Sequence, residues 1–106
     1  MKQHYEGVHE NDADGNPAGG HSWATGIEVN WQNGPLNVDG VRVEPTGAFV
    51  ETMIAITIDR IEYYQTSKFA CSENAIALDH LYAALQILNQ RTRSRERRGI
   101  EGTHEI

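Results

Sequence analysis

The stretch that decides the fold runs from Ser72 to Gly99 and reads SENAIALDHLYAALQILNQRTRSRERRG. Apolar side chains recur along it at alternating steps of three and four residues: Leu78, Leu81, Leu85, Leu88 and Thr92. This spacing is the heptad seam of a helix that packs against another helix. Ser72 is a favourable N-cap, and Gly99 after several arginines is typical of a helix end. The sequence therefore predicts one helix of about 26 residues, about 39 Å long, over this stretch.

A second helix is predicted immediately before it, from about Pro45–Gly47 to about Ser67. One apolar face is made by Val50, Ile54, Ile58 and Ile61. An adjacent face carries Phe49, Met53, Ile56 and Tyr63, so we expect burial on more than one side. Only a few residues around Lys68–Cys71 separate the two helices, and such a short link predicts an antiparallel hairpin. A lone hairpin leaves apolar surface uncovered, which favours a homo-oligomer, either a dimer or a hexamer.

The N-terminal region, residues 1–47, is rich in Gly, Asn, Asp and Pro and has strand character. Apolar and polar residues alternate over Ile27–Trp31, Asn33–Pro35 supplies a turn, and a second short strand is predicted around Val41 and Val43. Residues 11–20 are predicted to be an irregular loop. The fold class expected is α+β in a single domain over 1–106. A small antiparallel sheet (1–47) precedes a long helical hairpin with a tail (48–106).

Composition excludes several classes of protein. The chain has 106 residues and one cysteine, Cys71, which rules out an intrachain disulfide framework and a cysteine-rich zinc site; we expect Cys71 to be a core residue. No apolar run suits a membrane span, and the first residues lack a signal peptide's apolar stretch. The histidines form no HExxH motif, and no GxSxG, Walker or GxGxxG pattern occurs. We expect a cytoplasmic protein without a metal or other cofactor.

The charge is unevenly distributed. Residues 1–51 carry the whole net charge of −6, whereas 52–106 are neutral overall. Five arginines fall within eight residues, at Arg91, Arg93, Arg95, Arg97 and Arg98. A compact arginine cluster in an acidic chain favours a local anion site over a nucleic-acid surface, which needs a broad basic footprint.

Three of these arginines, Arg91, Arg95 and Arg98, are predicted to continue the leucine stripe, because they follow Leu88 at steps of three and four. Like charges at this spacing repel unless an anion neutralises them, and guanidinium groups suit phosphates. The alternative is a solvated, charged helix end that complements the helix dipole.

Other polar and aromatic residues are candidates for the same site. Stacking on a purine ring is possible for Tyr63, Tyr64 and Phe69, although such residues also serve in cores. Asn74, in the first turn of the second helix, is suited to a base edge or a ribose hydroxyl, or to a local cap. Arg42 and Arg60 are the isolated basic residues that would complete an anion cage, unless they pair with nearby acids.

The C-terminal tail offers a second candidate site. Gly99 and Gly102 favour a tight turn with backbone N–H groups available to an anion. Arg98 would lie beside this turn, with Thr103 and His104 as hydrogen-bond donors to a second phosphate. The competing interpretation is that the tail docks Ile100 and Ile106 on a neighbouring subunit.

Four segments carry a family resemblance over most of the chain: GHSWATGIEVNWQNGPL (20–36), EPTGAFVETMI (44–54), RIEYYQ (60–65) and ENAIALDHLYAALQILNQRTRSRERRGIEGTHEI (73–106). They resemble the phage anti-Thoeris sponge family called Thoeris anti-defence one. The last segment also resembles the helical hairpin of phage anti-CBASS sponges. The ending RGIEGTHEI is the most specific part, because helix formation does not require these residues in this order.

The resemblance implies a sponge in the cytoplasm of an infected bacterium. Such a protein binds cyclic ADP-ribose isomers made by TIR-domain enzymes without cleaving them, and some members also hold cyclic di- or trinucleotides at a separate site. It implies a stacking role for Tyr64, where the family often has phenylalanine, and a polar contact for Asn74. Phosphate binding would fall to Arg91 and Arg95, with a further arginine from the sheet region at Arg42.

Two other classes of function remain as alternatives. A phosphodiesterase or ADP-ribosyl hydrolase would recognise the same signals and cleave them. A hairpin that binds nucleic acid through its arginine-rich helix is the third interpretation, and the net charge of −6 argues against it.

Overall fold

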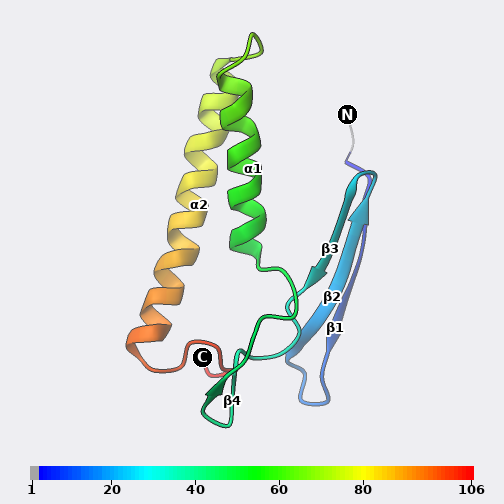
Figure 1. The fold of residues 1–106 in the computed structure, drawn as a ribbon, viewed down its shortest axis with the longest axis vertical. Helices are drawn as coiled ribbons and strands as arrows, with labels where there is room; N and C mark the ends of the chain where they lie inside the picture. The colour runs from blue at the N-terminus through cyan, green and yellow to red at the C-terminus, as the bar shows by residue number, and fades with distance from the viewer. Residues whose placement is uncertain (1–2) are drawn as a thin grey trace. The chain divides into compact units, whose positions relative to one another are not determined.

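Five strands and two helices form within residues 3–106, the part of the chain that this computed structural model describes (Figure 1). They group into two compact units. One unit joins the chain up to Phe49 with Ile100–Ile106, and the other comprises Val50–Gly99. The expected α+β class, with antiparallel strands before a helical hairpin, is confirmed.

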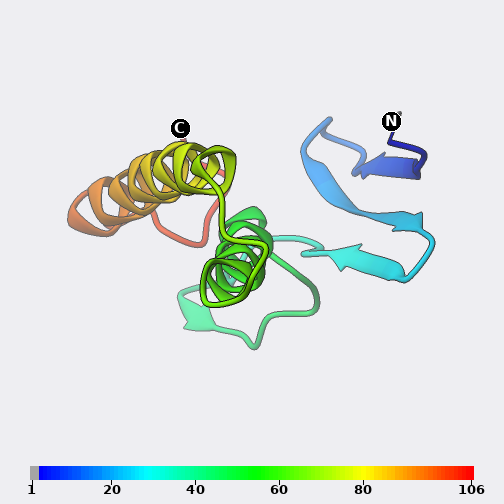
Figure 2. The same cartoon turned by 90° about the horizontal axis from the view of Figure 1, so that it is seen from above.

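The second unit is the hairpin of α1 (Val50–Gln65) and α2 (Ser72–Arg97), which lie side by side in Figures 1 and 2. The α2 residues that are at least half-buried include the whole predicted seam: Leu78, Leu81, Leu85, Leu88 and Thr92. A matching stripe on α1 is formed by Glu51, Ile54, Ile58, Ile61 and Gln65. Both stripes step by three and four residues, as facing heptad seams do.

The start of α1 differs from the prediction because the preceding segment is held against a strand. Ala48 N–H donates to the Asn30 carbonyl at 2.8 Å, and Gln32 N–H donates to the Ala48 carbonyl at 3.0 Å. A side chain on Gly47 would place its Cβ 2.6 Å from the backbone of Trp31, so only glycine fits there. This pairing holds Ala48 in a bridge with Trp31, and the helix begins at Val50 instead of at 45–47.

Three further expectations about the helices differ from the structure. On the adjacent face, Ile56 and Tyr63 are each more than half exposed while Phe49 and Met53 are partly buried, so a second side of the helix is only partly buried within this chain. The N-cap of α2 is Cys71, not Ser72, and it makes no side-chain capping hydrogen bond. Cys71 is also exposed, so it is not the predicted core residue. Within residues 3–106, neither helix is long and apolar enough to cross a membrane.

The first unit contains an antiparallel sheet of β1 (Glu6–Asn11), β2 (Pro17–Ala24) and β3 (Ile27–Trp31), in that spatial order. The prediction of an irregular loop over 11–20 therefore holds only for residues 12–16, the β1–β2 turn, and is wrong for Asn11 and for 17–20, which lie in strands. Asp12 closes the β1–β2 turn by accepting hydrogen bonds from the N–H groups of Asp14 and Asn16, both at 2.9 Å. The Asn16 bond in particular lowers the pKa of Asp12.

A glycine-dependent close approach makes this pairing possible. Gly20 has φ = 143°, and a Cβ there would lie 2.3 Å from the Val8 carbonyl oxygen. No other residue fits so near the neighbouring strand. Gly20 thus serves strand pairing, although glycine normally indicates a loop.

A small second hairpin follows, made of β4 (Asn37–Val38) and β5 (Val41–Arg42). Asp39 and Gly40 between them both have positive φ, at 52° and 79°, as a two-residue hairpin turn requires. The predicted second strand is present but stops at Arg42. It positions the Arg42 side chain for the contacts described below.

Candidate functional site

The arginine-rich end of α2 presents its side chains on different faces. Arg95 is 8% exposed and is the buried charged residue among those described. It lies seven residues after Leu88 and therefore belongs to the seam. Arg91 and Arg98 are exposed. The prediction that all three arginines continue the leucine stripe holds for Arg95 alone, because the other two are out of phase with the heptad.

Asn74 occupies the same heptad position as Arg95, three heptads earlier. It is half-buried in the first turn of α2, at the opposite end of the helix. The helix rise places Asn74 about 25 Å from Arg91 and about 31 Å from Arg95 along the axis. A single hairpin thus keeps the amide candidate and the phosphate-binding candidates apart.

The aromatic candidate Tyr64 lies at the Asn74 end, near the C-terminus of α1. Arg60 Nε donates a hydrogen bond to the Tyr64 hydroxyl at 3.2 Å, and the Arg60 guanidinium carbon lies 4.9 Å from the Tyr64 ring centroid. The same guanidinium lies 5.0 Å from the Tyr63 ring centroid. The Tyr64 hydrogen bond raises the pKa of Arg60, so this group is a permanent cation. Tyr64 therefore already has a cationic neighbour.

The loop that joins the helices fixes the C-terminal end of α1. Ser67 Oγ donates to the Tyr64 carbonyl at 2.6 Å and accepts from Phe69 N–H at 3.1 Å. Thr66 Oγ1 donates to the Tyr63 carbonyl at 2.7 Å. These bonds satisfy carbonyls that the helix end leaves unpaired. They hold the backbone of the tyrosine pair in a defined position.

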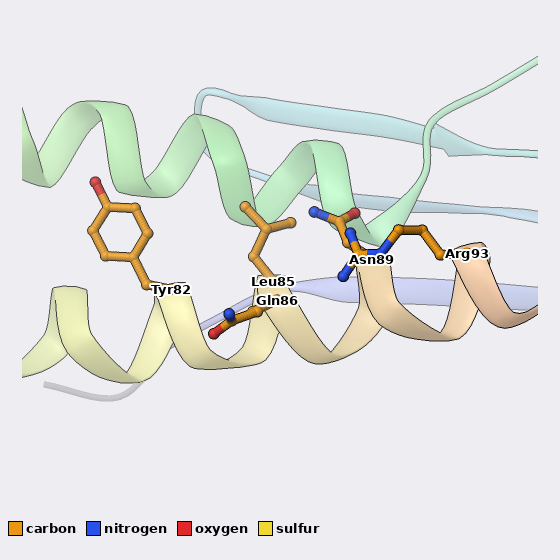
Figure 3. A pocket seen from close by; sticks show the side chains of 5 residues that line it. All are labelled: Tyr82, Leu85, Gln86, Asn89 and Arg93. Atoms are coloured by element: carbon orange, nitrogen blue, oxygen red, sulfur yellow. The ribbon is translucent and has the colours of Figure 1, made fainter.

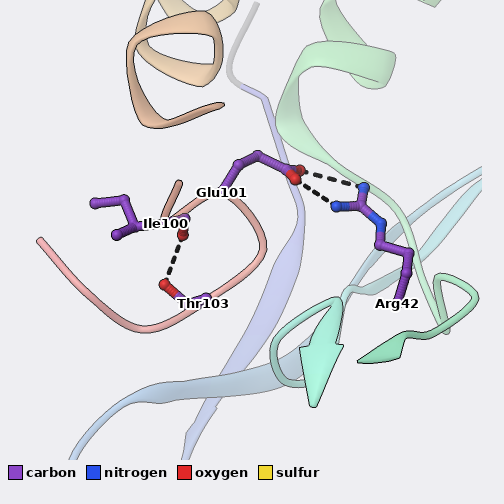
Figure 4. Close-up of polar contacts among 4 residues, drawn as sticks. All are labelled: Arg42, Ile100, Glu101 and Thr103. Carbon is purple, nitrogen blue, oxygen red and sulfur yellow. Dashed lines mark hydrogen bonds and ion pairs between the residues drawn. The ribbon is translucent and has the colours of Figure 1, made fainter. Parts of the chain in front are cut away.

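Arg42, the candidate from the sheet region, is engaged by the tail of the same unit. Its guanidinium forks onto the Glu101 carboxylate: Nη1 pairs with Oε2, and Nη2 lies 3.2 Å from Oε1 (Figure 4). Sequence reasoning did not find this partner, because 59 residues separate the two and no spacing pattern links them. An anion that binds Arg42 through this fork has to compete with Glu101.

The C-terminal tail forms a turn, as its glycines predict. Gly99 and Gly102 have positive φ, at 74° and 80°, and Asn37 N–H donates to the Gly102 carbonyl at 2.9 Å. Ile100 is buried in its own chain, whereas Ile106 is 99% exposed. The tail turn is therefore anchored to β4 of its own unit.

The tail residues of the candidate second site belong to the first unit. Thr103 Oγ1 donates to the Ile100 carbonyl at 2.5 Å, and Thr103 N–H donates to the same oxygen at 3.1 Å (Figure 4). Both Thr103 donors thus form hydrogen bonds within the turn. His104 is exposed. Arg98 belongs to the hairpin unit, whereas Gly102, Thr103 and His104 belong to the other.

An open pocket of about 420 Å³ lies along α2 (Figure 3). Its lining residues are Tyr82, Leu85, Gln86, Asn89 and Arg93. None of the predicted site residues is among them. A hydrogen bond with Glu62 of α1 raises the pKa of Tyr82, so the phenol is held in its neutral form across the two helices. Residues 3–106 contain no group of three His, Cys, Asp or Glu side chains arranged to hold a metal ion.

The hairpin that carries these residues matches a known family. The Acb2/Tad1 hairpin domain covers residues 24–93, from the end of β2 through most of α2. The chain belongs to the Acb2/Tad1 hairpin family. Tyr64, Asn74 and Arg91 lie inside the matched region of this Acb2/Tad1 hairpin protein, and Arg95 and the tail follow it.

A relative of this Acb2/Tad1 hairpin protein is Thoeris anti-defense 1 of Bacillus phage SBSphiJ7. It is 48% identical over 77 residues, which cover 73% of this chain and 51% of the relative. The chain thus spans about half the length of that relative. The resemblance found from the sequence segments is confirmed at the level of the family.

Proposed function

We propose that this phage-type protein is a sponge: it binds cyclic ADP-ribose signals made by TIR-domain enzymes, holds them intact and so inhibits Thoeris immunity. It acts in the cytoplasm of the infected bacterium. Membership of the Acb2/Tad1 hairpin family and 48% identity to a protein named Thoeris anti-defense 1 support this proposal.

One observation carries the mechanism: the candidate ligand groups lie at the two ends of α2. A cyclic dinucleotide-sized ligand is much shorter than the roughly 25–31 Å between Asn74 and the arginines. We therefore propose a homo-oligomer in which two hairpins pack antiparallel. The tyrosine end of one hairpin then lies beside the arginine end of its partner, and each dimer forms two equivalent sites.

Exposed apolar side chains on the hairpin supply surface for such packing. Ile56, Ile76 and Ile87 are each more than half exposed. Burying them against a second copy removes apolar area from water, which is favourable by about 25 cal/mol per Å². The exposed face of α1 that the sequence predicted to be buried is then covered by the partner.

Within each site the residues take different roles. Tyr64 stacks on a base, and the Asn74 amide contacts a base edge or a ribose hydroxyl. Arg95 and Arg91 hold the phosphates through bidentate hydrogen bonds, for which guanidinium is suited. Arg42 contributes a further cation from the sheet region, in exchange for its contact with Glu101.

Cyclic di- or trinucleotides, the CBASS signals, are proposed ligands of a separate site. It would use Arg98 from the end of the helix and the turn of Gly102 and His104, while Thr103 keeps this turn in shape through its two bonds to Ile100. Such a site leaves the cyclic ADP-ribose site free, so both classes of ligand bind at once.

The decisive experiment incubates the protein with cyclic ADP-ribose isomers, denatures it by heat and identifies the released nucleotide by mass spectrometry. A sponge returns the intact ligand. Recovery of a linear or hydrolysed product would instead establish a phosphodiesterase or an ADP-ribosyl hydrolase. Native mass spectrometry with a panel of cyclic nucleotides then gives the ligands bound per oligomer. A stable monomer of 11.9 kDa at micromolar concentration would contradict the two-copy site.

A further inference from the structure

Arg60, Tyr63 and Tyr64 form an exposed cluster on α1. Arg60 lies three and four residues before the two tyrosines, so all three share one side of the helix. The ring centroids of Tyr63 and Tyr64 are 6.0 Å apart with an interplanar angle of 50°. The Arg60 guanidinium lies about equally far from both rings, at 5.0 and 4.9 Å. One cation therefore contacts two aromatic rings.

Arg60 contacts Tyr64 in two ways and Tyr63 in one. Its guanidinium lies over the Tyr64 ring, and its Nε donates to the Tyr64 hydroxyl at 3.2 Å. The hydrogen bond restrains the far end of the ring, while the loop bonds described above restrain its backbone. A side chain that is already restrained loses less conformational entropy when a ligand binds.

The position of the guanidinium also decides which face of Tyr64 is open. A cation over one face occupies that face, because the negative face of the ring quadrupole attracts it. A ligand ring can then stack only on the opposite face, and an electron-rich purine is favoured there because offset stacking pairs complementary charge distributions.

We infer that Arg60 is the positioning residue of the stacking platform: it fixes the Tyr64 ring and leaves one face of it for a purine base. This inference rests on the proposed function, in which Tyr64 stacks on the ligand. Arg60 itself need not contact the nucleotide. Its contribution is to hold the ring in the stacking orientation before the ligand arrives.

A matched control lies in the loop that follows α1. Lys68 Nζ is 5.4 Å from the Phe69 ring centroid, a second cation–aromatic pair at the same end of the hairpin. Lys68→Gln removes the same charge as Arg60→Gln without touching the Tyr64 ring. It therefore corrects for the general loss of positive charge near an anionic ligand.

The experiment compares Arg60→Gln, Arg60→Lys, Tyr64→Phe, the double variant Arg60→Gln/Tyr64→Phe, and Lys68→Gln. In the ligand-free protein, NMR of isotope-labelled tyrosine should show the Tyr64 ring resonances moving in Arg60→Gln and staying in place in Lys68→Gln. Titration calorimetry with cyclic ADP-ribose should show about two- to fivefold weaker binding for Arg60→Gln, the range expected for an exposed cation–π contact. Arg60→Lys keeps the charge and should recover part of this loss.

The double variant separates positioning from direct contact. If Arg60 acts through Tyr64, the double variant binds no more weakly than Arg60→Gln, because both substitutions remove the same contribution to binding. Additive losses, or unchanged Tyr64 resonances, overturn the inference. Equal binding by Arg60→Gln and the wild type overturns it too, while leaving the proposed function intact. A wild type that binds no cyclic ADP-ribose at all removes the proposed function and this inference with it.

Discussion

Gln65 and Cys71 hold each other through two hydrogen bonds of opposite direction. Gln65 Nε2 donates to the Cys71 carbonyl at 3.1 Å, and the Cys71 N–H donates to Gln65 Oε1 at 3.0 Å. Gln65 is the last residue of α1, and Cys71 is the N-cap of α2. The amide side chain therefore closes the loop and supports the end of the hairpin where Tyr64 and Asn74 lie.

The variant Gln65→Met keeps the length of the side chain and removes both bonds. We expect the free energy of unfolding to fall by about 1–2 kcal/mol, since each hydrogen bond contributes roughly 0.5–1.5 kcal/mol. Urea denaturation followed by circular dichroism at fixed protein concentration measures this. Gln90→Met, at an exposed position of α2, is the control. Equal midpoints for the two variants would show that the loop does not depend on this amide.

The arginines at the end of α2 should separate into two kinds. Arg91→Ala and Arg95→Ala are both expected to weaken cyclic ADP-ribose binding at least tenfold, since a charge-assisted hydrogen bond is worth about 1.5–3 kcal/mol. Arg95→Ala should also lower the thermal midpoint because its side chain is buried, whereas Arg91→Ala should not. The exposed Arg97→Ala is the comparison for calorimetry and thermal unfolding. Wild-type affinity in both test variants would remove these residues from the site.

A site shared between two antiparallel hairpins predicts complementation. Asn74→Ala and Arg95→Ala should each abolish tight binding alone. After co-refolding in equal amounts, half of the dimers are mixed and each mixed dimer keeps one intact site, so about a quarter of the sites recover. Calorimetric stoichiometry measures this fraction. Native mass spectrometry establishes that the mixture contains mixed dimers. If such a mixture still has no tight sites, one chain supplies both residues.

The tail turn should be sensitive to a single methyl group. Gly102 has φ = 80°, and its Cβ would lie 3.2 Å from Leu36 Cβ. Gly34 has a similar φ of 81° with open space around it. Both Gly→Ala changes cost about 1–2 kcal/mol of backbone strain. We expect Gly102→Ala to accelerate hydrogen exchange of the Asn37 amide, which donates to Gly102, and Gly34→Ala to leave it unchanged. The same exchange rate in both variants would argue against a tight fit at Gly102.

Alkaline pH should loosen the hairpin through Tyr82. The hydrogen bond with Glu62 raises the pKa of this phenol, so the folded state favours the neutral form. The resulting stability is fully present below the ordinary tyrosine pKa of about 10 and is lost as pH rises through the higher folded value. Thermal unfolding between about pH 8 and pH 11 should show a steeper decline for the wild type than for Tyr82→Phe. Parallel pH profiles would count against this cross-helix bond.

The hairpin was predictable because its determinants are local and periodic. Leu78, Leu81, Leu85 and Leu88 repeat at heptad spacing, and the following glycine marks the helix end. The same periodicity, continued strictly, separates Arg95 from Arg91 and Arg98, since seven residues link Leu88 to Arg95. Steps of three and four alone do not separate the buried Arg95 from the exposed Arg91 and Arg98.

The sheet region was less predictable because its determinants are contacts between distant backbones. A glycine at position 20 favours a loop, yet the absence of a Cβ there leaves room for the Val8 carbonyl oxygen. Likewise, Gln32 uses its side-chain carbonyl to hold the N–H groups of Thr46 and Gly47, which sets the start of α1. The Arg42–Glu101 pair joins residues 59 apart. No periodicity encodes such contacts.

The tail has a consequence for the timing of synthesis. Ile100–Ile106 belong to the same compact unit as the strands, although the 50 residues of Val50–Gly99 come between them. At about 5–20 residues per second, a ribosome needs roughly 3–10 s to make that hairpin. Throughout this interval the Asn37 N–H lacks the Gly102 carbonyl and Arg42 lacks its carboxylate, because Gly102 and Glu101 do not yet exist. The strands made first are thus completed last, and the nascent chain carries an unfinished N-terminal unit while its helices form.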